Sequence, residues 1–448
     1  MISEQRDDHR TKCSLDQATV GPQSSEPCYP ITLQDVLERS NMAQAWKRVR
    51  SNKGAAGTDG RSIEDTADYL KTQWPDIRKA LLAGTYKPVP TKVVYIPKSG
   101  GGQRMLGIPS VTDRLIQQAI MQQLSPYYQA DFSPSSFGFQ AGKSALQAVT
   151  QAHHHALEGY NIAVDIDLEK FFDRVNHDIL MGLLSKRIRD KSLLKLIRTY
   201  LSNGMMEGGL VTQRSEGTPQ GSPLSPLLSN ILLDELDKEL ERRGHRFCRY
   251  ADDVQIHVKS RRAGARTLDS LSRFIEQHLK LKVNRRKSSV GSITRSQFLG
   301  YSFYGTRQPR IRCGTESIQR FKRRIRQLTR GHHRQSMGIR LRALDRYIRG
   351  WVSYFRLTQT ERLFKDLDSW IRSRLRMCLM KLWPKPKTRI RKLIRLGMPP
   401  EEAAGYGQHK RWWFYAQLHH TRFVFNIQFW RRCGYRGLSF YLSRFANT

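Results

Sequence analysis

Two adjacent aspartates interrupt a short apolar segment in the middle of the chain, and this interruption constrains the local fold. Residues 247–250 have the apolar character of one strand, and residues 254–258 alternate between apolar and polar like a second strand. Asp252 and Asp253 then occupy the turn of a β-hairpin. Carboxylates held side by side repel each other. The pair therefore predicts either a solvated turn or part of a site for a divalent cation.

A second acidic strand supplies the further carboxylates that such a site needs. The sequence NIAVDIDL at 161–168 predicts an apolar strand, and EKFFDRVNHDIL after it predicts the start of a helix. Asp165 and Asp167 lie two positions apart, so on a strand they share one face. An acid at a strand end beside an acidic hairpin turn is the layout of a phosphoryl-transfer site with two Mg²⁺ ions.

The charge of the chain is strongly positive and unevenly distributed. The formal net charge is +38 over 448 residues, which predicts a polyanionic partner. Residues 301–448 hold 34 Lys and Arg against 7 Asp and Glu, so the last third carries most of the excess. We therefore expect the heaviest contact with nucleic-acid phosphates there.

The sequence shows no pattern of a membrane span, a signal peptide or a disulfide framework. No stretch approaches the roughly 18 apolar residues of a membrane span. The N-terminal sequence MISEQRDDHR has no apolar core of a signal peptide. The six cysteines form no CxxC pair, so we expect reduced thiols. Together these features predict a cytoplasmic protein with no membrane partner.

His153, His154 and His155 form a run that invites a metal-binding interpretation. Three consecutive positions of a helix point in three directions. We therefore interpret the run as a solvated helix surface rather than a metal site.

The pattern of elements divides the chain into four regions. Residues 1–30 are polar and unpatterned, which predicts a mobile N-terminal arm. Strands and helices alternate over 31–304. Apolar residues at helical spacing, opposite basic faces, predict an α-helical region over 305–383. Residues 384–448 form a basic C-terminal extension, which begins with a proline-bearing connector at 384–393.

Five motifs follow one another in the order of a known family. They are IPKSGGGQRMLGIP (96–109), DLEKFFDRVNH (167–177), GTPQGSPLSPLLSN (217–230), the box YADD (250–253) and FLGY (298–301). The chain resembles the bacterial group II intron-encoded reverse transcriptase/maturases, of the compact type without an endonuclease domain. The resemblance implies an α+β fold. Residues 31–304 would form the fingers and palm of a right-hand polymerase, with an antiparallel sheet and helices, and 305–383 a helical thumb/maturase domain. Residues 384–448 would be its basic maturase extension.

The resemblance also implies catalytic residues. Asp167, Asp252 and Asp253 would be the catalytic and metal-binding acids and would hold two Mg²⁺ ions. In the family the first acid lies five residues before an aromatic residue, which selects Asp167 over Asp165 because Phe172 follows at that spacing. Phe172 would then close the pocket beneath the incoming sugar and exclude a 2′-hydroxyl.

Further residues are expected around the nucleotide. Lys98 and Arg104 flank a glycine turn and resemble the family pair that clamps the triphosphate. Gln220 matches the glutamine that contacts the nucleotide. Lys287 matches the lysine that assists the leaving pyrophosphate, by charge or as a proton donor. Without the resemblance, these four are ordinary turn or surface residues.

The RNA surface is expected in three segments. The loop GFQAGKSA (138–145) departs from the usual family pattern, in which arginines are common, although Lys143 can still meet a phosphate as a point charge. LDRYIRGWVSYFRL (344–357) looks like the thumb/maturase signature, and KLWPKPKTRIRKLIRLGM (381–398) resembles its basic continuation. The candidate RNA-binding residues in these two segments are Arg346, Arg349, Arg356, Lys385, Lys387, Arg389 and Arg391.

The resemblance implies an RNA-directed DNA polymerase that also binds its structured group II intron RNA to promote splicing and mobility. Its partners would be the intron RNA, an RNA template with a DNA primer, target DNA and dNTPs, in a ribonucleoprotein of the bacterial cytosol or nucleoid. Two alternatives stay open: a splicing-only maturase with a dead polymerase, and a domesticated relative in defence or DNA repair. The intact aspartate set argues against the first, and the basic maturase-like tail argues for an intron context.

Overall fold

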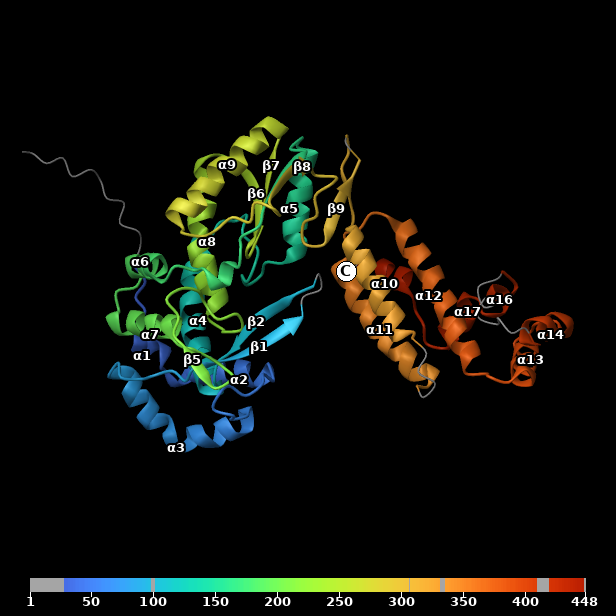
Figure 1. Ribbon diagram of the computed structural model, residues 1–448, viewed down its shortest axis with the longest axis horizontal. Helices are drawn as coiled ribbons and strands as arrows, with labels where there is room; N and C mark the ends of the chain where they lie inside the picture. Colours follow the sequence, from blue (N-terminus) through green and yellow to red (C-terminus); the bar gives the residue numbers. More distant parts are fainter. Residues whose placement is uncertain (1–27, 98–100, 306, 331–334, 409–418, 447–448) are drawn as a thin grey trace, which may run out of the picture.

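The chain folds into a mixed helix-and-sheet part, which ends with β10 (Arg310–Cys313), and a helical part that follows from Thr315 (Figure 1). The computed structural model describes residues 28–97, 101–305, 307–330, 335–408 and 419–446. Lys98 and residues 1–27 of the predicted arm lie outside this range. No helix within the described segments is long and apolar enough to cross a membrane.

Residues 28–30, which we assigned to the arm, are anchored to the fold through Tyr29. Tyr29 is buried, and its N–H donates to the carbonyl oxygen of Arg187 at 2.7 Å. Its hydroxyl donates to the carboxylate of Asp131. The arm prediction is therefore wrong for these residues, because one aromatic side chain anchors a segment whose composition is otherwise polar.

The N-terminal part of the chain builds a four-stranded sheet with the order β2-β1-β4-β5. Strands β1 and β2 form the predicted glycine-turn hairpin, in which Ile96 pairs with Arg104. Strand β4 lies parallel to β1. The elements of this part are α1 (Leu33–Val36), α2 (Arg39–Ser51), α3 (Ile63–Leu82), β1 (Thr91–Pro97), β2 (Gln103–Ile108), α4 (Val111–Asp131), α6 (His177–Arg187), α7 (Lys191–Ser202), β4 (Met205–Glu207) and β5 (Leu210–Thr212).

A second four-stranded sheet, which we call the palm sheet, is antiparallel throughout, with the order β6-β7-β3-β8. One face packs on α8 and α9, and α5 covers the other face (Figure 1). The antiparallel sheet with helices is thus as expected. Its elements are α5 (Ala145–Leu157), β3 (Ile162–Ile166), the 3₁₀ turn Phe171–Asp173, α8 (Ser225–Arg242), β6 (Arg246–Tyr250), β7 (Asp253–Val258), α9 (Arg261–His278) and β8 (Ser289–Ser292).

The strands β9 (Tyr301–Tyr304) and β10 (Arg310–Cys313) pair antiparallel before the helical part begins. The long helices then start at Thr315 rather than near 305. The sequence RIRC gives β10 alternating exposed and buried residues, and this period-2 pattern escaped a prediction based on helical spacing. The long helices are α10 (Thr315–Leu328), α11 (Met337–Tyr354) and α12 (Glu361–Lys381).

The last region packs against the preceding helices as one body. Asp368 on α12 accepts hydrogen bonds from the backbone N–H groups of Leu438 and Ser439 at 2.7 and 3.0 Å. The predicted connector at 384–393 is mostly helical, because Pro386 opens a helix. The terminal elements are α13 (Pro386–Arg395), α14 (Pro400–Gln408), α16 (His419–Val424), α17 (Ile427–Arg432) and α18 (Leu438–Ala446), and their buried residues share one core with α11 and α12.

Candidate active site

The two adjacent aspartates lie at the tip of the β6–β7 hairpin, as predicted. Tyr250 pairs with Asp253, so Asp253 opens β7, and Ala251 and Asp252 form the turn. Ala251 has a φ of 57°, in the left-handed region that alanine rarely adopts. Such a conformation persists only where surrounding contacts impose it.

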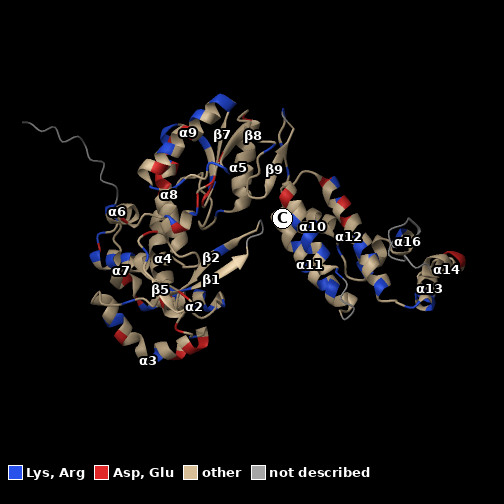
Figure 2. Cartoon of the chain, viewed as in Figure 1, with Lys and Arg blue, Asp and Glu red and all other residues tan. Residues whose placement is uncertain are grey.

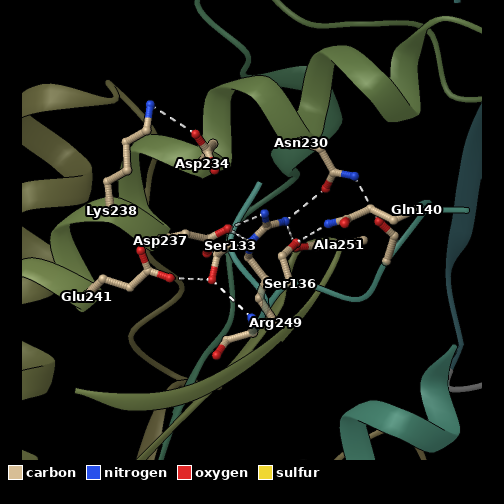
Figure 3. Close-up of polar contacts among 12 residues, drawn as sticks. Ser133, Ser136, Gln140, Asn230, Asp234, Asp237, Lys238, Glu241, Arg249 and Ala251 are labelled. Atoms are coloured by element: carbon tan, nitrogen blue, oxygen red, sulfur yellow. Dashed lines mark hydrogen bonds and ion pairs between the residues drawn. The ribbon is translucent and has the colours of Figure 1, made fainter. Parts of the chain in front are cut away.

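Those contacts come from Arg249, which is fully buried two residues before the turn (Figure 3). Its guanidinium donates to the carboxylate of Asp237 and, through Nη1, to Asn230 Oδ1 at 2.9 Å and to the Ala251 carbonyl oxygen at 3.2 Å. Asn230 Nδ2 in turn donates to the carbonyl oxygen of Gly138 at 2.8 Å. Helix α8 and the loop before α5 therefore hold the turn through one polar network.

The sequence did not identify this network. Asn230 ends the motif GTPQGSPLSPLLSN and Arg249 directly precedes the box YADD. Their places beside two motifs were the available signal. Asp237, in contrast, sits in an ordinary-looking charged helix, and only burial distinguishes it.

Asp167 directly follows the last residue of β3, and β3 is the strand that pairs with β7 of the hairpin. Its N–H donates to Ser288 Oγ at 3.1 Å, and its carbonyl oxygen accepts from the Asn284 N–H at 2.8 Å. Lys287 Nζ lies 3.7 Å from Asp167 Oδ2. The structure therefore brings together two of the residues that the resemblance singled out.

Asp165 has a different role from Asp167. Its carboxylate accepts hydrogen bonds from Gln255 Nε2 at 2.7 Å and from Ser296 Oγ at 2.8 Å. These neutral donors satisfy its oxygens. This supports the choice of Asp167 over Asp165 as the candidate cation ligand.

The three candidate acids act on one another electrostatically. The Asp253 side chain reaches solvent, but protein surrounds much of its carboxyl group. Desolvation, followed by the charges of Asp252, Asp167 and Asp165, raises its pKa to about 6. Burial and, to a smaller extent, Asp167 also raise the pKa of Asp252. The charge of Arg104, exposed on β2, opposes both shifts.

These three carboxylates fit Mg²⁺ by their chemistry. They are hard oxygen donors, and a bound dication would offset both the desolvation and the repulsion that raise the pKa of Asp253. Their oxygens are close enough to interact, although within the described residues the three acids do not form a cluster with all ligand atoms inside 4.8 Å.

The motif around Phe172 adjoins the motif around Gln220. The carbonyl oxygen of Phe172 accepts from the Thr218 N–H at 2.6 Å, and its ring is half-buried. The Gln220 carbonyl oxygen accepts from the Gly107 N–H on β2 at 2.8 Å. A Cβ at Gly221 would lie 2.6 Å from the Gly107 oxygen, so the close approach requires glycine.

Most of the predicted RNA-binding residues are exposed on the helical part of the chain. Figure 2 shows the basic residues along α11, where acidic residues are few. The exposed members of the predicted set are Arg346, Arg349, Arg356, Lys385, Lys387 and Arg391.

The structure contradicts the prediction for two other cations. Lys143 Nζ donates to the carbonyl oxygens of Ser133 and Ser136 at 2.9 and 2.7 Å, so it closes its own loop instead of facing a phosphate. Arg389 is buried and donates to the carbonyl oxygens of Gly407 and Pro384 at 3.0 and 2.8 Å. Composition marked both as basic, but their side chains satisfy backbone carbonyls inside the fold.

Known proteins match the chain in both of its parts. Residues 96–303 match the family model "Reverse transcriptase (RNA-dependent DNA polymerase)", and residues 318–397 match "Group II intron, maturase-specific domain". Protein YkfC of Escherichia coli (strain K12) is 31% identical, with 60% of this chain and 81% of YkfC covered. The group II intron-encoded protein LtrA of Lactococcus lactis subsp. cremoris is 32% identical, with 61% of this chain covered.

The match covers 43% of LtrA, so this chain spans less than half of that protein's length. A solved structure described as a partial Cas6-RT-Cas1–Cas2 complex is 25% identical with a TM-score of 0.37, and the match covers 55% of this chain and 43% of that one.

The two family matches run in the order expected from the motifs, and the second crosses the boundary that we predicted at 383. The chain belongs to the group II intron reverse transcriptase/maturase family, which are RNA-directed DNA polymerases.

Proposed function

We propose that the chain extends a DNA primer on an RNA template, with Asp167, Asp252 and Asp253 holding two Mg²⁺ ions. The observation that carries this proposal is the placement of Asp252 and Asp253 at the tip of the β6–β7 hairpin, beside the end of β3, which Asp167 directly follows. Desolvation, and then the charges of the neighbouring acids, raise the pKa of Asp253. When bound, the ions would stabilise the attacking and leaving oxygens of an in-line displacement at phosphorus.

The chain's own residues would bind and orient the nucleotide. Arg104, and Lys98 across the same glycine turn, would contact the triphosphate oxygens. Phe172 would lie beneath the deoxyribose and exclude a 2′-hydroxyl, and Gln220 would contact the nucleotide beside it. Lys287 would supply charge or a proton to the leaving pyrophosphate.

Asparagine at position 252 tests the polymerase proposal. Asp252→Asn keeps the size of the side chain but removes a charge from the cation site. We expect primer extension on an RNA template to collapse while the affinity for RNA stays unchanged. Asp165→Asn is the matched control, since that acid lies on β3 but binds neutral donors, and it should retain extension. Full extension by Asp252→Asn would refute the assignment.

We further propose that the exposed arginines of α11 and the exposed basic residues of α13 bind a structured group II intron RNA and promote its splicing and mobility into target DNA. The match to the maturase-specific domain over 318–397 supports this half of the proposal. The ribonucleoprotein would act in the bacterial cytosol or nucleoid.

Splicing of a candidate intron at low Mg²⁺ tests the maturase proposal. We expect the protein to accelerate splicing, and Asp252→Asn to accelerate it equally, because the RNA surface does not include the acids. A splicing-only protein would show the first effect without any polymerase activity. A relative working in defence or repair would extend primers without accelerating splicing, and that result would remove the maturase claim.

A further inference from the structure

Three potential metal ligands meet on the face of the palm sheet that α5 covers. Cys248 lies on β6, His257 on β7 and His155 on α5, and one ligand atom from each lies within 4.8 Å of the other two. Their exposed fractions are 0%, 1% and 6%. Across the described part of the chain, no other three His, Cys, Asp or Glu residues meet this spacing.

The nitrogen atoms of this group lack hydrogen-bond partners. Both ring nitrogens of His257 and Nδ1 of His155 are buried and unpaired within the described structure. Buried polar atoms are almost always paired, because leaving one unpaired costs free energy of folding. Three unpaired nitrogens at one place therefore point to a missing partner.

The chemical state of the group suits a metal ion. Both imidazoles lie in the protein interior, where the neutral ring is the favoured form. A neutral imidazole offers a lone pair to a metal. The two ring centroids lie 5.1 Å apart with an interplanar angle of 62°, so the rings meet edge to face rather than stacked.

The surroundings of the three side chains include one small residue, one arginine and one acid. The strand partners of His257 are Ala163 on β3, which is small, and Arg246 on β6. Glu158 Oε2 lies 3.8 Å from Arg246 Nε, so an acid accompanies this cation. Of the three residues, His155 lines an open groove of about 630 Å³, and this is the side from which an ion would enter.

We propose that His155, Cys248 and His257 form a Zn²⁺ site with two nitrogen ligands and one thiolate. Zinc accepts such nitrogen and sulfur donors, whereas Mg²⁺ prefers oxygen. Binding would displace the thiol proton of Cys248 to solvent. The site is separate from the catalytic acids, because His257 follows Asp253 by four residues, about 13 Å along β7.

Such an ion would act on the structure of the palm. It would tie α5 to both strands of the hairpin whose tip carries Asp252 and Asp253. We therefore assign it a stabilising role, independent of the Mg²⁺ chemistry of the proposed polymerase.

Metal analysis of the full-length protein tests the proposal. The protein is purified without a histidine tag or chelator after growth with added zinc, and its metals are measured by mass spectrometry. We expect one zinc per chain, falling to less than about a tenth in Cys248→Ser and His155→Gln. His154→Gln, an exposed neighbour on α5, and Cys313→Ser, another buried cysteine, are the matched controls and should keep the zinc.

Two further measurements separate metal binding from misfolding. Circular dichroism and gel filtration establish that each variant is folded, and Co²⁺ in place of zinc should give a sulfur-to-metal charge-transfer band that Cys248→Ser lacks. A zinc-selective chelator should lower the melting temperature of the parent but not that of folded His155→Gln. A parent without metal, a bound metal other than zinc, or zinc retained by folded Cys248→Ser or His155→Gln would overturn the proposal.

Discussion

Arg249 and Asp237 form an ion pair in which neither side chain is exposed to solvent. Arg249 Nε donates to Asp237 Oδ1 at 2.8 Å, while Nη1 reaches the carbonyl oxygen of Ala251 (Figure 3). Ala251 has a left-handed backbone conformation and directly precedes Asp252. Because this conformation is strained for alanine, the buried arginine stabilises the turn that presents Asp252, the proposed catalytic acid.

Removal of the Arg249 side-chain charge should destabilise the protein strongly. Arg249→Met leaves the Asp237 carboxylate buried without its partner, and we expect the free energy of unfolding to fall by about 3–5 kcal/mol. The double variant Arg249→Met/Asp237→Leu removes both charges, so its stability should return to within about 2 kcal/mol of the parent. Urea unfolding of the three proteins measures both effects.

Primer extension by the double variant then separates positioning from stability. The variant is stable but still lacks the contact to Ala251. We expect its kcat to remain at least about tenfold below that of the parent, with little change in KM for the dNTP. A parental kcat would limit Arg249 to a structural role.

Primer extension should require glycine at position 138, because the backbone there lies against the Ala251–Asp252 turn. A Cβ at this position would lie 2.3 Å from the Ala251 nitrogen, so Gly138→Ala forces the loop and the turn apart. We expect primer extension to fall by about 100-fold, the cost of a misplaced catalytic group. Gly182→Ala is the matched control, since a Cβ there meets nothing within 4 Å. Similar rates for the two variants would contradict the proposed contact.

The hairpin and its acids could be predicted because their signals are local. Alternating apolar residues and an acidic turn fall within residues 247–258, and the glycine turn with the strands β1 and β2 falls within residues 91–108. The polar network behind the turn could not, because it joins distant residues: Asn230 and Gly138 are 92 positions apart. Their pairing depends on tertiary packing, which periodicity does not report.

Predictions based on charge and residue type were also wrong for side chains that the fold buries. Arg389 lies on the same side of α13 as buried Leu393, four residues later, so this arginine belongs to the core face. The prediction that three consecutive histidines point in three directions was correct, but one direction leads inward. His155 is buried while His154 is exposed, so the interpretation of the whole run as helix surface was wrong.

Asp113, near the start of α4, should make stability depend on pH. Burial raises its pKa from 3.8 to about 6, although Ser110 and Tyr86 donate hydrogen bonds to its carboxylate. Between these values the folded protein holds a proton that the unfolded chain has released. The free energy of unfolding therefore falls as pH rises from about 4 to about 6, by up to about 3 kcal/mol.

Comparison with Asp113→Asn isolates this contribution. Asparagine does not titrate, whereas Asp234 and Asp253, whose pKa values are also raised to about 6, titrate in both proteins. In urea unfolding, the stability of the parent relative to the variant should decrease between pH 4 and 6 and then stay constant. A difference that is independent of pH would show that Asp113 titrates normally in the fold.

Loss of charge should weaken RNA binding when it occurs at exposed arginines of α11, and should lower stability when it occurs at buried Arg389 on α13. Arg346→Gln/Arg349→Gln removes two exposed charges, so RNA affinity should weaken and its logarithmic salt slope should decrease by about 2, with an unchanged melting temperature. Arg389→Gln instead loses hydrogen bonds to backbone carbonyls, so stability should fall by about 1–3 kcal/mol while the salt slope of the folded protein stays the same. Filter binding at several salt concentrations and thermal unfolding measure both. If Arg389→Gln changes the slope and the α11 variant does not, the phosphate-binding surface lies on α13 rather than on α11.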